Sequence, residues 1–149
     1  MKLCRTQGTL VTFALGSCVG ICMYDPEIKL AGLLHIMLPK KNPQDKNILK
    51  YADTGIPEMI RKMEAFGAIR GRMVAKIAGG AKMFAFAAGN SAIDHIGDRN
   101  VESVKEVLRK ERIRLLREDV GGNYARTLYF DVATGEAMVK TFGKGEVKL

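Results

Sequence analysis

Residues 16–38, GSCVGICMYDPEIKLAGLLHIML, decide the fold and also carry the residues of greatest chemical interest. The segment contains two apolar runs, at 19–24 and 30–38, separated by Asp25-Pro26, a pair that is typical of a turn. The second run is apolar on both faces, which indicates a strand buried within a layered structure. We therefore predict an antiparallel hairpin at the centre of the fold.

This hairpin brings Cys18 and His35 close together. A register that places them directly opposite one another also pairs Tyr24 with Lys29 and leaves a four-residue loop, a length commonly built on a type I turn. Directly opposed residues lie on the same face of the sheet with Cβ atoms roughly 5 Å apart. A register shift of one residue would send the two side chains to opposite faces. We expect Cys18 and His35 to face each other.

A cysteine beside a histidine can form a nucleophile and its base. A free thiol has a pKa of about 8.5, so little of it is thiolate at neutral pH, and a nearby imidazole can take its proton. Gly16 and Gly20 flank Cys18 and leave room for backbone N–H groups to approach a reacting carbonyl. The residues alone also allow a purely structural interpretation, in which Cys18 is a small core residue and His35 is a buried, hydrogen-bonded histidine.

Two further interpretations of Cys18 remain open at this point. A structural zinc site from Cys18, Cys22 and His35 is conceivable, but it lacks a C-x2-C pair and a second ligand pair. Residues 10–18 resemble a lipoprotein signal, yet the apolar run is short and apolarity continues beyond the cysteine. No other stretch reaches the roughly 18 apolar residues of a membrane helix. The odd number of cysteines, three, suits a reducing compartment.

Composition places the chain among globular proteins and argues against a nucleic-acid partner. It is 47% hydrophobic and 27% charged, with a net charge of +8 over 149 residues, which indicates acidic partners. It has no tryptophan, no aromatic cluster of the RNA-binding type and no zinc-finger or helix-turn-helix signature. His95, the only histidine besides His35, is expected to be a surface residue in a loop.

The rest of the chain predicts two main helices and about seven strands within one domain, residues 1–149. Helical spacing predicts one helix that begins near Asp53 or Thr54 and stops at Gly67, and another that begins near Asp98 or Asn100. The fold class is α/β, a layered sandwich with a mixed or antiparallel sheet. The further strands are expected at 9–15, 72–78, 113–117, 126–132 and 136–142, a loop is expected at 89–97, the last residues are expected to fray, and 83–88 favour no one state.

Seven short segments follow one another along the chain: LGSCVG at 15–20, YDP at 24–26, HIMLP at 35–39, KYADT at 50–54, AKIAGGA at 75–81, IGDRNV at 96–101 and EDVGGN at 118–123. In this order they resemble the chemoreceptor glutamine deamidase family, CheD. The resemblance covers nearly the whole chain, although family members usually have a further strand-like segment before Gly8-Thr9-Leu10, where this sequence has only residues 1–7.

The resemblance implies an enzyme that converts selected glutamines of chemoreceptors to glutamates with release of ammonia. It implies Cys18 as the nucleophile, His35 as general base and acid, and Thr12 as a third member that orients the imidazole. It also implies a layered α/β fold similar to that of cysteine-dependent toxin deamidases, with no metal or organic cofactor. The expected location is the cytoplasm, without membrane insertion.

The resemblance also implies two kinds of protein partner. Methyl-accepting chemoreceptors are the expected substrates, and a CheC-type chemotaxis phosphatase is the expected regulatory partner. An alternative is that the chain works mainly as an interaction protein that binds this phosphatase. The intact set of Thr12, Cys18 and His35 favours the enzyme.

Overall fold

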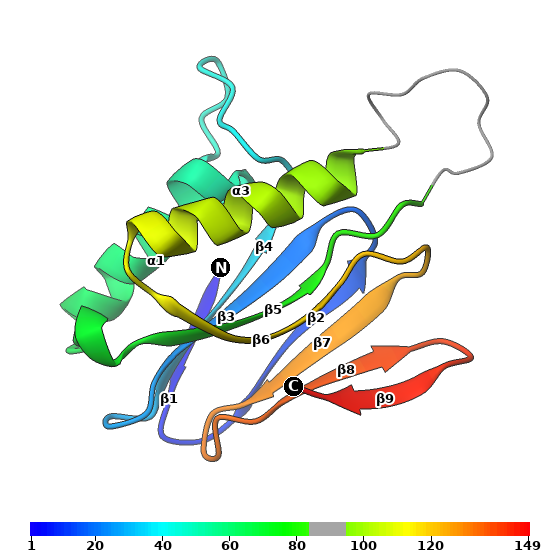
Figure 1. Cartoon of the computed structure of the whole chain (residues 1–149). Helices are drawn as coiled ribbons and strands as arrows, with labels where there is room; N and C mark the ends of the chain where they lie inside the picture. The colour runs from blue at the N-terminus through cyan, green and yellow to red at the C-terminus, as the bar shows by residue number, and fades with distance from the viewer. Residues whose placement is uncertain (84–94) are drawn as a thin grey trace.

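The computed structural model describes residues 1–83 and 95–149. The described residues form three layers (Figure 1). Helices α1 (Ala52–Ala65) and α3 (Ile96–Lys110) cover one face of a five-stranded sheet, and a four-stranded sheet covers its other face. This arrangement confirms the predicted α/β layered sandwich with two main helices.

The five-stranded sheet is mixed and contains the predicted hairpin at its centre. Its strands lie in the order β1-β4-β3-β5-β6, and only the β5–β6 pair is parallel. Every residue of β3 is buried, because helices lie on one side of it and the second sheet on the other. The strand bounds are β1 (Lys2–Arg5), β4 (Leu30–Ile36), β3 (Val19–Asp25), β5 (Val74–Gly79) and β6 (Arg114–Val120).

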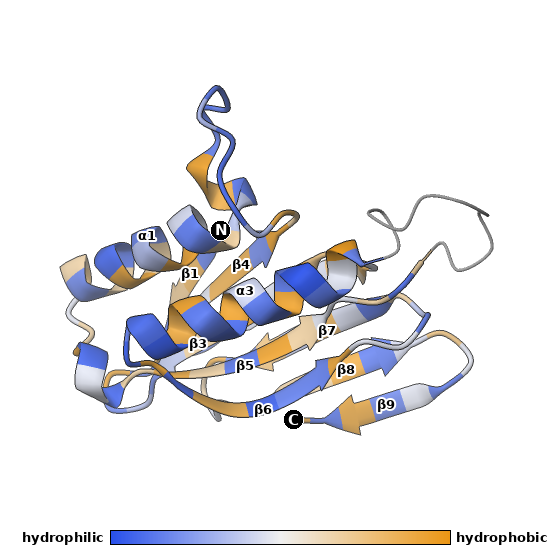
Figure 2. Ribbon diagram, turned by 45° about the horizontal axis from the view of Figure 1, so that its top comes forward, coloured by the Kyte–Doolittle hydropathy of each residue, from blue (hydrophilic) through white to orange (hydrophobic). Residues whose placement is uncertain are grey.

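The second sheet is antiparallel, in the order β2-β7-β8-β9. The predicted closing hairpin is confirmed as β7–β8, and its turn contains Gly135 at φ +74°, a left-handed conformation that favours glycine. Figure 2 shows β9 at the outer edge of the molecule, beside β8. The strand bounds are β2 (Thr9–Leu15), β7 (Arg126–Asp131), β8 (Ala137–Thr141) and β9 (Gly145–Lys148).

Two separate cores lie between the three layers. The first lies between the helices and the mixed sheet, and the second lies between the two sheets. Successive residues of β4 alternate between them: Leu34 and Ile36 belong to the first core, whereas Leu33 belongs to the second. The predicted stripe of α1 is confirmed at Ile56, Met59, Ile60 and Met63, which are fully buried in the first core, but it is wrong at Phe66, which follows the end of the helix and is 61% exposed.

The predicted register of the β3–β4 hairpin is wrong. His35 lies opposite Gly20 rather than Cys18, a shift of two residues. The loop has the predicted length of four residues but begins one residue later, at Pro26, and Lys29 closes it with φ +48°. Because the shift is even, Cys18 still belongs to the face of the hairpin on which His35 lies.

Several element boundaries also differ from the prediction, since α1 begins at Ala52, β5 begins at Val74 and β6 extends to Val120. The sequence does not predict strands β1 and β9, because each has only four residues and lacks a clear apolar alternation. Strand β1 pairs with β4 and occupies the region before Gly8. Helix α3 begins at Ile96, before the predicted Asp98. Two further segments lie mostly outside the described residues. They are 83–88, for which the sequence favours no one state and of which only Met83 is described, and the predicted loop at 89–97.

Short connections complete the described chain. The 3₁₀ helix η1 (Ile48–Lys50) precedes α1, and η2 (Arg70–Arg72) precedes β5. Helix α1 ends before Gly67, as predicted, and Gly67 takes φ +98° there. Neither α1 nor α3, the two α-helices in the described ranges, is long and apolar enough to cross a membrane.

Candidate active site

A hydrogen bond across the two sheets joins Thr12 to His35. The Thr12 hydroxyl on β2 lies 2.8 Å from Nδ1 of His35 on β4. Thr12 is almost completely buried, with 8% of its surface exposed, and His35 is half-buried. The bond therefore fixes the imidazole in a partly dry layer between the sheets, where a hydrogen bond is stronger than in water.

Gly20 makes this hydrogen bond possible. It lies directly opposite His35, and a Cβ atom at Gly20 would lie only 3.1 Å from the Thr12 methyl carbon and 3.0 Å from a Leu15 methyl carbon. Side chains of β2 occupy the space that a side chain at Gly20 would fill. Strand β2 can therefore approach the mixed sheet closely enough for Thr12 to reach the imidazole. The sequence suggested a different use for this glycine, namely room for a reacting carbonyl.

Cys18 lies in the bend that connects β2 to β3, immediately before β3. Its side chain is half-buried and packs against the core between the two sheets, the layer into which Thr12 also points. The structure therefore places all three predicted site residues on the inter-sheet side: Thr12 and His35 are in direct contact, and Cys18 lies two residues before Gly20, just beyond the last pair of the hairpin.

An irregularity in β2 directs the chain from one sheet to the other. The pairing of β2 with β7 shifts register between Thr12 and Leu15, and Ala14 adopts φ +55° within this bulge. Bulges and left-handed non-glycine residues are concentrated near functional sites, where they re-aim a strand. Here the bulge lets one segment supply Thr12 to the second sheet and Cys18 to the first.

A glycine turn after β5 holds the backbone of the cysteine loop. The Gly80 N–H donates to the Cys18 carbonyl and the Ala81 N–H donates to the Gly16 carbonyl, each at 2.8 Å. Gly79 has φ +119°, and a Cβ atom there would lie 2.1 Å from the Cys18 carbonyl oxygen. Only glycine permits so close an approach at this φ, so the turn at 79–81 fixes where the loop lies.

Helix α3 holds the same loop from the other side, through a residue to which the sequence analysis gave no role in the site. The Asn100 side-chain amide donates to the Ser17 carbonyl at 2.8 Å and to the Met37 carbonyl at 2.9 Å. Asn100 is completely buried. It belongs to the segment IGDRNV at 96–101, which the resemblance picked out, but its spacing indicated only a helix start.

Burial sets the protonation of the cysteine and the histidine. It raises the pKa of the Cys18 thiol, although a hydrogen bond from the backbone of the same residue acts in the opposite direction. It lowers the pKa of the His35 imidazole, and the positive charge at the amino terminus lowers it further. Both groups are therefore neutral near pH 7, and a charged pair would form only by transfer of the thiol proton to the imidazole.

The remaining candidates from the sequence lie apart from this arrangement. His95 is exposed at the start of α3, 3.5 Å from the Asp98 carboxylate, and is thus a surface residue as predicted. Within residues 1–83 and 95–149, no group of three or more histidine, cysteine, aspartate or glutamate side chains is arranged to hold a metal ion.

Exposed apolar side chains neighbour the three site residues in the chain. Met37 follows the His35 strand and is 49% exposed. Phe13 follows Thr12 and is 63% exposed, but it belongs to the opposite, outer face of β2. Met83 is 42% exposed and packs over Gly16, where a Cβ atom would lie 2.9 Å from its side chain. Large apolar side chains left open to solvent beside a site are typical of a docking surface for another molecule.

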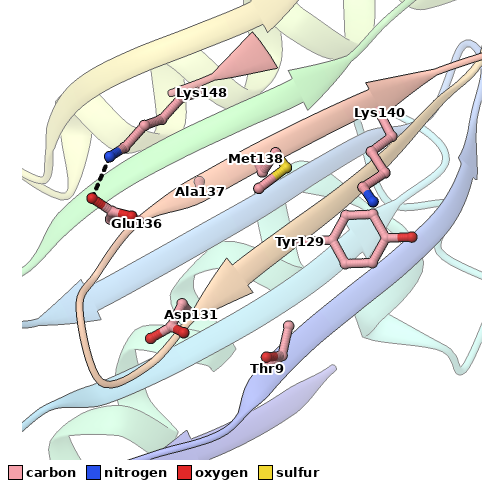
Figure 3. A pocket seen from close by; sticks show the side chains of 8 residues that line it. All are labelled: Thr9, Tyr129, Asp131, Glu136, Ala137, Met138, Lys140 and Lys148. Carbon is pink, nitrogen blue, oxygen red and sulfur yellow. Dashed lines mark hydrogen bonds and ion pairs between the residues drawn. The ribbon is translucent and has the colours of Figure 1, made fainter. Parts of the chain in front are cut away.

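A hollow on the outer face of the second sheet is separate from the candidate site. Figure 3 shows its lining, which includes Thr9 of β2 and Tyr129 of β7, with an ion pair between Lys148 and Glu136 at one end. Thr9 and Thr12 are three residues apart on β2, so they belong to opposite faces of the strand. None of the three predicted site residues lines this hollow.

The chain is similar to named proteins over nearly its whole length. A relative from Syntrophomonas wolfei is 53% identical over 148 residues, which cover 97% of this chain and 91% of that protein. A relative from Lachnoclostridium phytofermentans is 46% identical over 100% of this chain and 93% of its own length. A third, from Caldanaerobacter subterraneus, is 50% identical over 97% of this chain and 90% of its own. Each bears the curated name probable chemoreceptor glutamine deamidase CheD.

The family described as CheD chemotactic sensory transduction matches residues 37–141, most of the chain. That match begins two residues after His35, whereas the relatives extend the similarity over the segment that contains Thr12, Cys18 and His35. On both grounds, the chain belongs to the CheD family, whose curated members are named as chemoreceptor glutamine deamidases.

Proposed function

We propose that this chain, acting as one domain in the cytoplasm, deamidates selected glutamine side chains of methyl-accepting chemoreceptors, with Cys18 as the nucleophile. The observation that carries the proposal is the 2.8 Å contact between Thr12 and His35 on the side of the hairpin to which Cys18 belongs. A thiol, an imidazole and a group that orients the imidazole are the parts that acyl transfer through a cysteine requires.

The first half of the reaction forms a thioester. With its Nδ1–H donated to the Thr12 hydroxyl, His35 has a lone pair free on Nε2 and takes the proton from the Cys18 thiol. The thiolate attacks the carboxamide carbon, and a tetrahedral intermediate forms. His35 then gives its proton to the departing nitrogen, the C–N bond breaks, and ammonia leaves.

The second half regenerates the enzyme with a water molecule. His35, neutral again, takes a proton from water while the oxygen attacks the thioester carbon. The C–S bond breaks, the proton returns to the Cys18 sulfur, and the product is glutamate. The lowered pKa of His35 suits this role, because the imidazole is already in its basic form when each half begins.

The surroundings of the site suit a protein substrate. The exposed apolar side chains of Met37 and Met83 offer a docking surface, and the net charge of +8 favours association with an acidic partner. Receptor signalling helices that resemble coiled coils carry many acidic side chains, and a glutamine on such a helix projects a carboxamide that can reach a half-buried thiol.

Mass spectrometry of a receptor fragment incubated with the enzyme tests the proposal. Wild type is expected to produce the mass increase that accompanies replacement of an amide nitrogen by oxygen, together with free ammonia. Cys18→Ala and His35→Ala are expected to abolish both signals. Cys4→Ala is the matched control, because Cys4 is a partly exposed thiol on β1. Full activity in both Cys18→Ala and His35→Ala would contradict the mechanism.

Binding of a CheC-type phosphatase is a second role that the same exposed surface supports. A partner that covers Met37 and Met83 would block access of a receptor to Cys18. This role predicts that Cys18→Ala retains phosphatase binding while it loses deamidation, and that Met37→Ser weakens the binding. Calorimetric titration of the phosphatase into each variant distinguishes a regulatory partner from a substrate competitor.

A further inference from the structure

One buried side chain connects the loop that carries Cys18 to the strand that carries His35. Asn100 of α3 donates one side-chain N–H to the carbonyl of Ser17, the residue before Cys18, and the other to the carbonyl of Met37, two residues after His35. Both bonds are shorter than 3 Å, and both N–H groups of the amide are used.

The two acceptors belong to segments that no ladder hydrogen bond joins at this point. Pairing of β3 with β4 ends at Val19 and Ile36, so Ser17 and Met37 lie just beyond the last pair. Asn100 therefore continues the connection between the two segments after the sheet stops. Backbone hydrogen bonds hold each of these segments to a different neighbour: the cysteine bend to the glycine turn after β5, and Met37 to Lys50.

This connection has a cost in stability, because the Asn100 carbonyl oxygen is buried and has no hydrogen-bond partner among the described residues. A buried polar atom without a partner destabilises the folded state. An amide is therefore a poor choice for stability alone at a completely buried position of a helix. The hydrogen bonds that its two N–H groups donate to the two site segments explain why an amide occupies this position.

Two glycines set the depth at which α3 holds this amide. A Cβ atom at Gly97 would lie 2.6 Å from the Gly80 carbonyl oxygen, and a Cβ atom at Gly80 would lie 2.3 Å from a methyl carbon of Val101. The helix thus contacts the turn after β5 backbone to backbone. This close approach brings Asn100, one turn further along α3, within reach of both carbonyls.

We propose that Asn100 is a positioning residue, which fixes the distance between the Cys18 thiol and the His35 imidazole by holding the Ser17 and Met37 carbonyls together. The inference rests on the proposed function for its catalytic consequence. Its geometric claim concerns only the pairing of the thiol with the imidazole.

Replacement of Asn100 by alanine, with Ser103→Ala as the matched control, tests this assignment. Ser103 lies one turn further along the same helix, is also buried, and donates to the Pro39 carbonyl at 3.0 Å. Both variants lose a buried bond from α3 to a backbone carbonyl, but only Asn100 connects the two site segments. The second variant, Asn100→Ser, is smaller than asparagine but retains one donor.

The primary measurement is the rate of Cys18 alkylation by iodoacetamide as a function of pH, followed by peptide mass spectrometry. For Asn100→Ala, the rate at neutral pH is expected to fall about tenfold, the effect of one unit in the apparent thiol pKa. The pH profile is expected to move toward that of His35→Ala, and Ser103→Ala is expected to keep the wild-type profile. Loss of stability alone would lower the melting temperature of both variants and leave both profiles unchanged.

Deamidation of a receptor fragment supplies the second readout. Misplacement of a reacting group by about 1 Å costs on the order of 100-fold in rate, so Asn100→Ala is expected to lower kcat strongly and to leave KM near its wild-type value. Equal alkylation profiles and equal kcat for Asn100→Ala and Ser103→Ala would overturn the inference, as would failure of both Asn100 variants to fold.

The two readouts separate this inference from the proposed function. If wild type leaves receptor glutamines unchanged, the proposed function fails, but the alkylation profiles still show whether Asn100 pairs Cys18 with His35. If wild type deamidates the fragment and the Asn100 profiles match the control, the positioning role fails and the enzyme assignment stands.

Discussion

The third member of the candidate site is a neutral hydroxyl, and this choice has electrostatic consequences. A carboxylate beside His35 would stabilise the imidazolium and raise the pKa of the imidazole. Thr12 instead orients the ring through a hydrogen bond, and burial is left to lower the pKa of His35. The histidine is thus held as a base, and the ion pair with Cys18 forms only when the reaction requires it.

Thr12→Val removes the hydroxyl and preserves the shape of the side chain. The imidazole would lose the partner that fixes its orientation, so kcat for deamidation is expected to fall about tenfold, the equivalent of one hydrogen bond. Thr12→Ser is the matched control and is expected to keep most of the activity, since it retains the hydroxyl. A larger loss in Thr12→Ser than in Thr12→Val, measured by ammonia release, would contradict this role and assign the effect to the methyl group that packs over Gly20.

The lowered pKa of His35 predicts how stability depends on pH. In the unfolded chain the imidazole titrates near pH 6.5, and in the folded chain it titrates at a lower pH. Between the two values the unfolded state binds the extra proton, so the free energy of unfolding falls as the pH drops through this window. Above about pH 6.5 the imidazole is neutral in both states, so the free energy of unfolding keeps its full value there.

Urea unfolding of wild type and His35→Gln at several pH values measures this contribution. The variant is expected to lose the part of the pH dependence that begins just below neutral pH. His95→Gln removes the other histidine, which is exposed beside Asp98, and is expected to retain it. A wild-type stability that rises on acidification through this window would contradict the assignment.

At the scale of elements, the contact between α3 and the turn after β5 determines where the site segments lie. Gly97→Ala tests it. Helix propensity alone would favour alanine by about 1 kcal/mol. The new Cβ atom, however, would lie 2.6 Å from the Gly80 carbonyl oxygen and 2.7 Å from that of Ala81, and neither backbone atom can rotate away.

We therefore expect Gly97→Ala to destabilise the fold by about 1–3 kcal/mol, the usual cost of overpacking, and to lower deamidation because Asn100 moves with the helix. Gly71→Ala is the control, since a Cβ atom there would meet nothing within 4 Å. Thermal unfolding and ammonia release measure the two effects. Stabilisation by Gly97→Ala would show that propensity outweighs the contact.

The elements themselves could be predicted from the sequence where hydrophobic periodicity was strong. Both sides of the central hairpin, helix α1 and the β7–β8 hairpin follow from apolar runs and turn residues. The register of the β3–β4 hairpin could not be predicted in this way. The predicted and the observed register put the same side chains on the same faces and differ only in which residue closes the loop. That residue is Lys29, and its left-handed conformation is unusual for a lysine.

At the scale of the whole molecule, the candidate site depends on contacts between layers that sequence spacing does not encode. The hairpin alone predicts that Cys18 and His35 share a face, although Cys18 lies in the bend before β3 and its predicted pairing with His35 is wrong. Thr12 comes from the other sheet and was named only through the family resemblance, and Asn100 comes from a helix 82 residues after Cys18. Local patterns predict faces and turns, but which distant segments meet across a layer depends on packing.

Charge is also a property of the whole molecule, and it predicts how association with a receptor depends on salt. The chain carries a net charge of +8, and opposite charges on a partner accelerate encounter at low ionic strength. At about 1 M salt the Debye length is only about 3 Å, so this attraction is screened. We expect KM for an acidic receptor fragment to rise with salt while kcat stays nearly constant, because the thiol and imidazole are partly buried and less exposed to screening.

Alkylation of Cys18 by neutral iodoacetamide is the control, since its rate involves no steering. A KM independent of salt would show that the apolar surface around Met37 and Met83 provides the association, and a parallel rise in KM and fall in alkylation would instead indicate that salt perturbs the site itself.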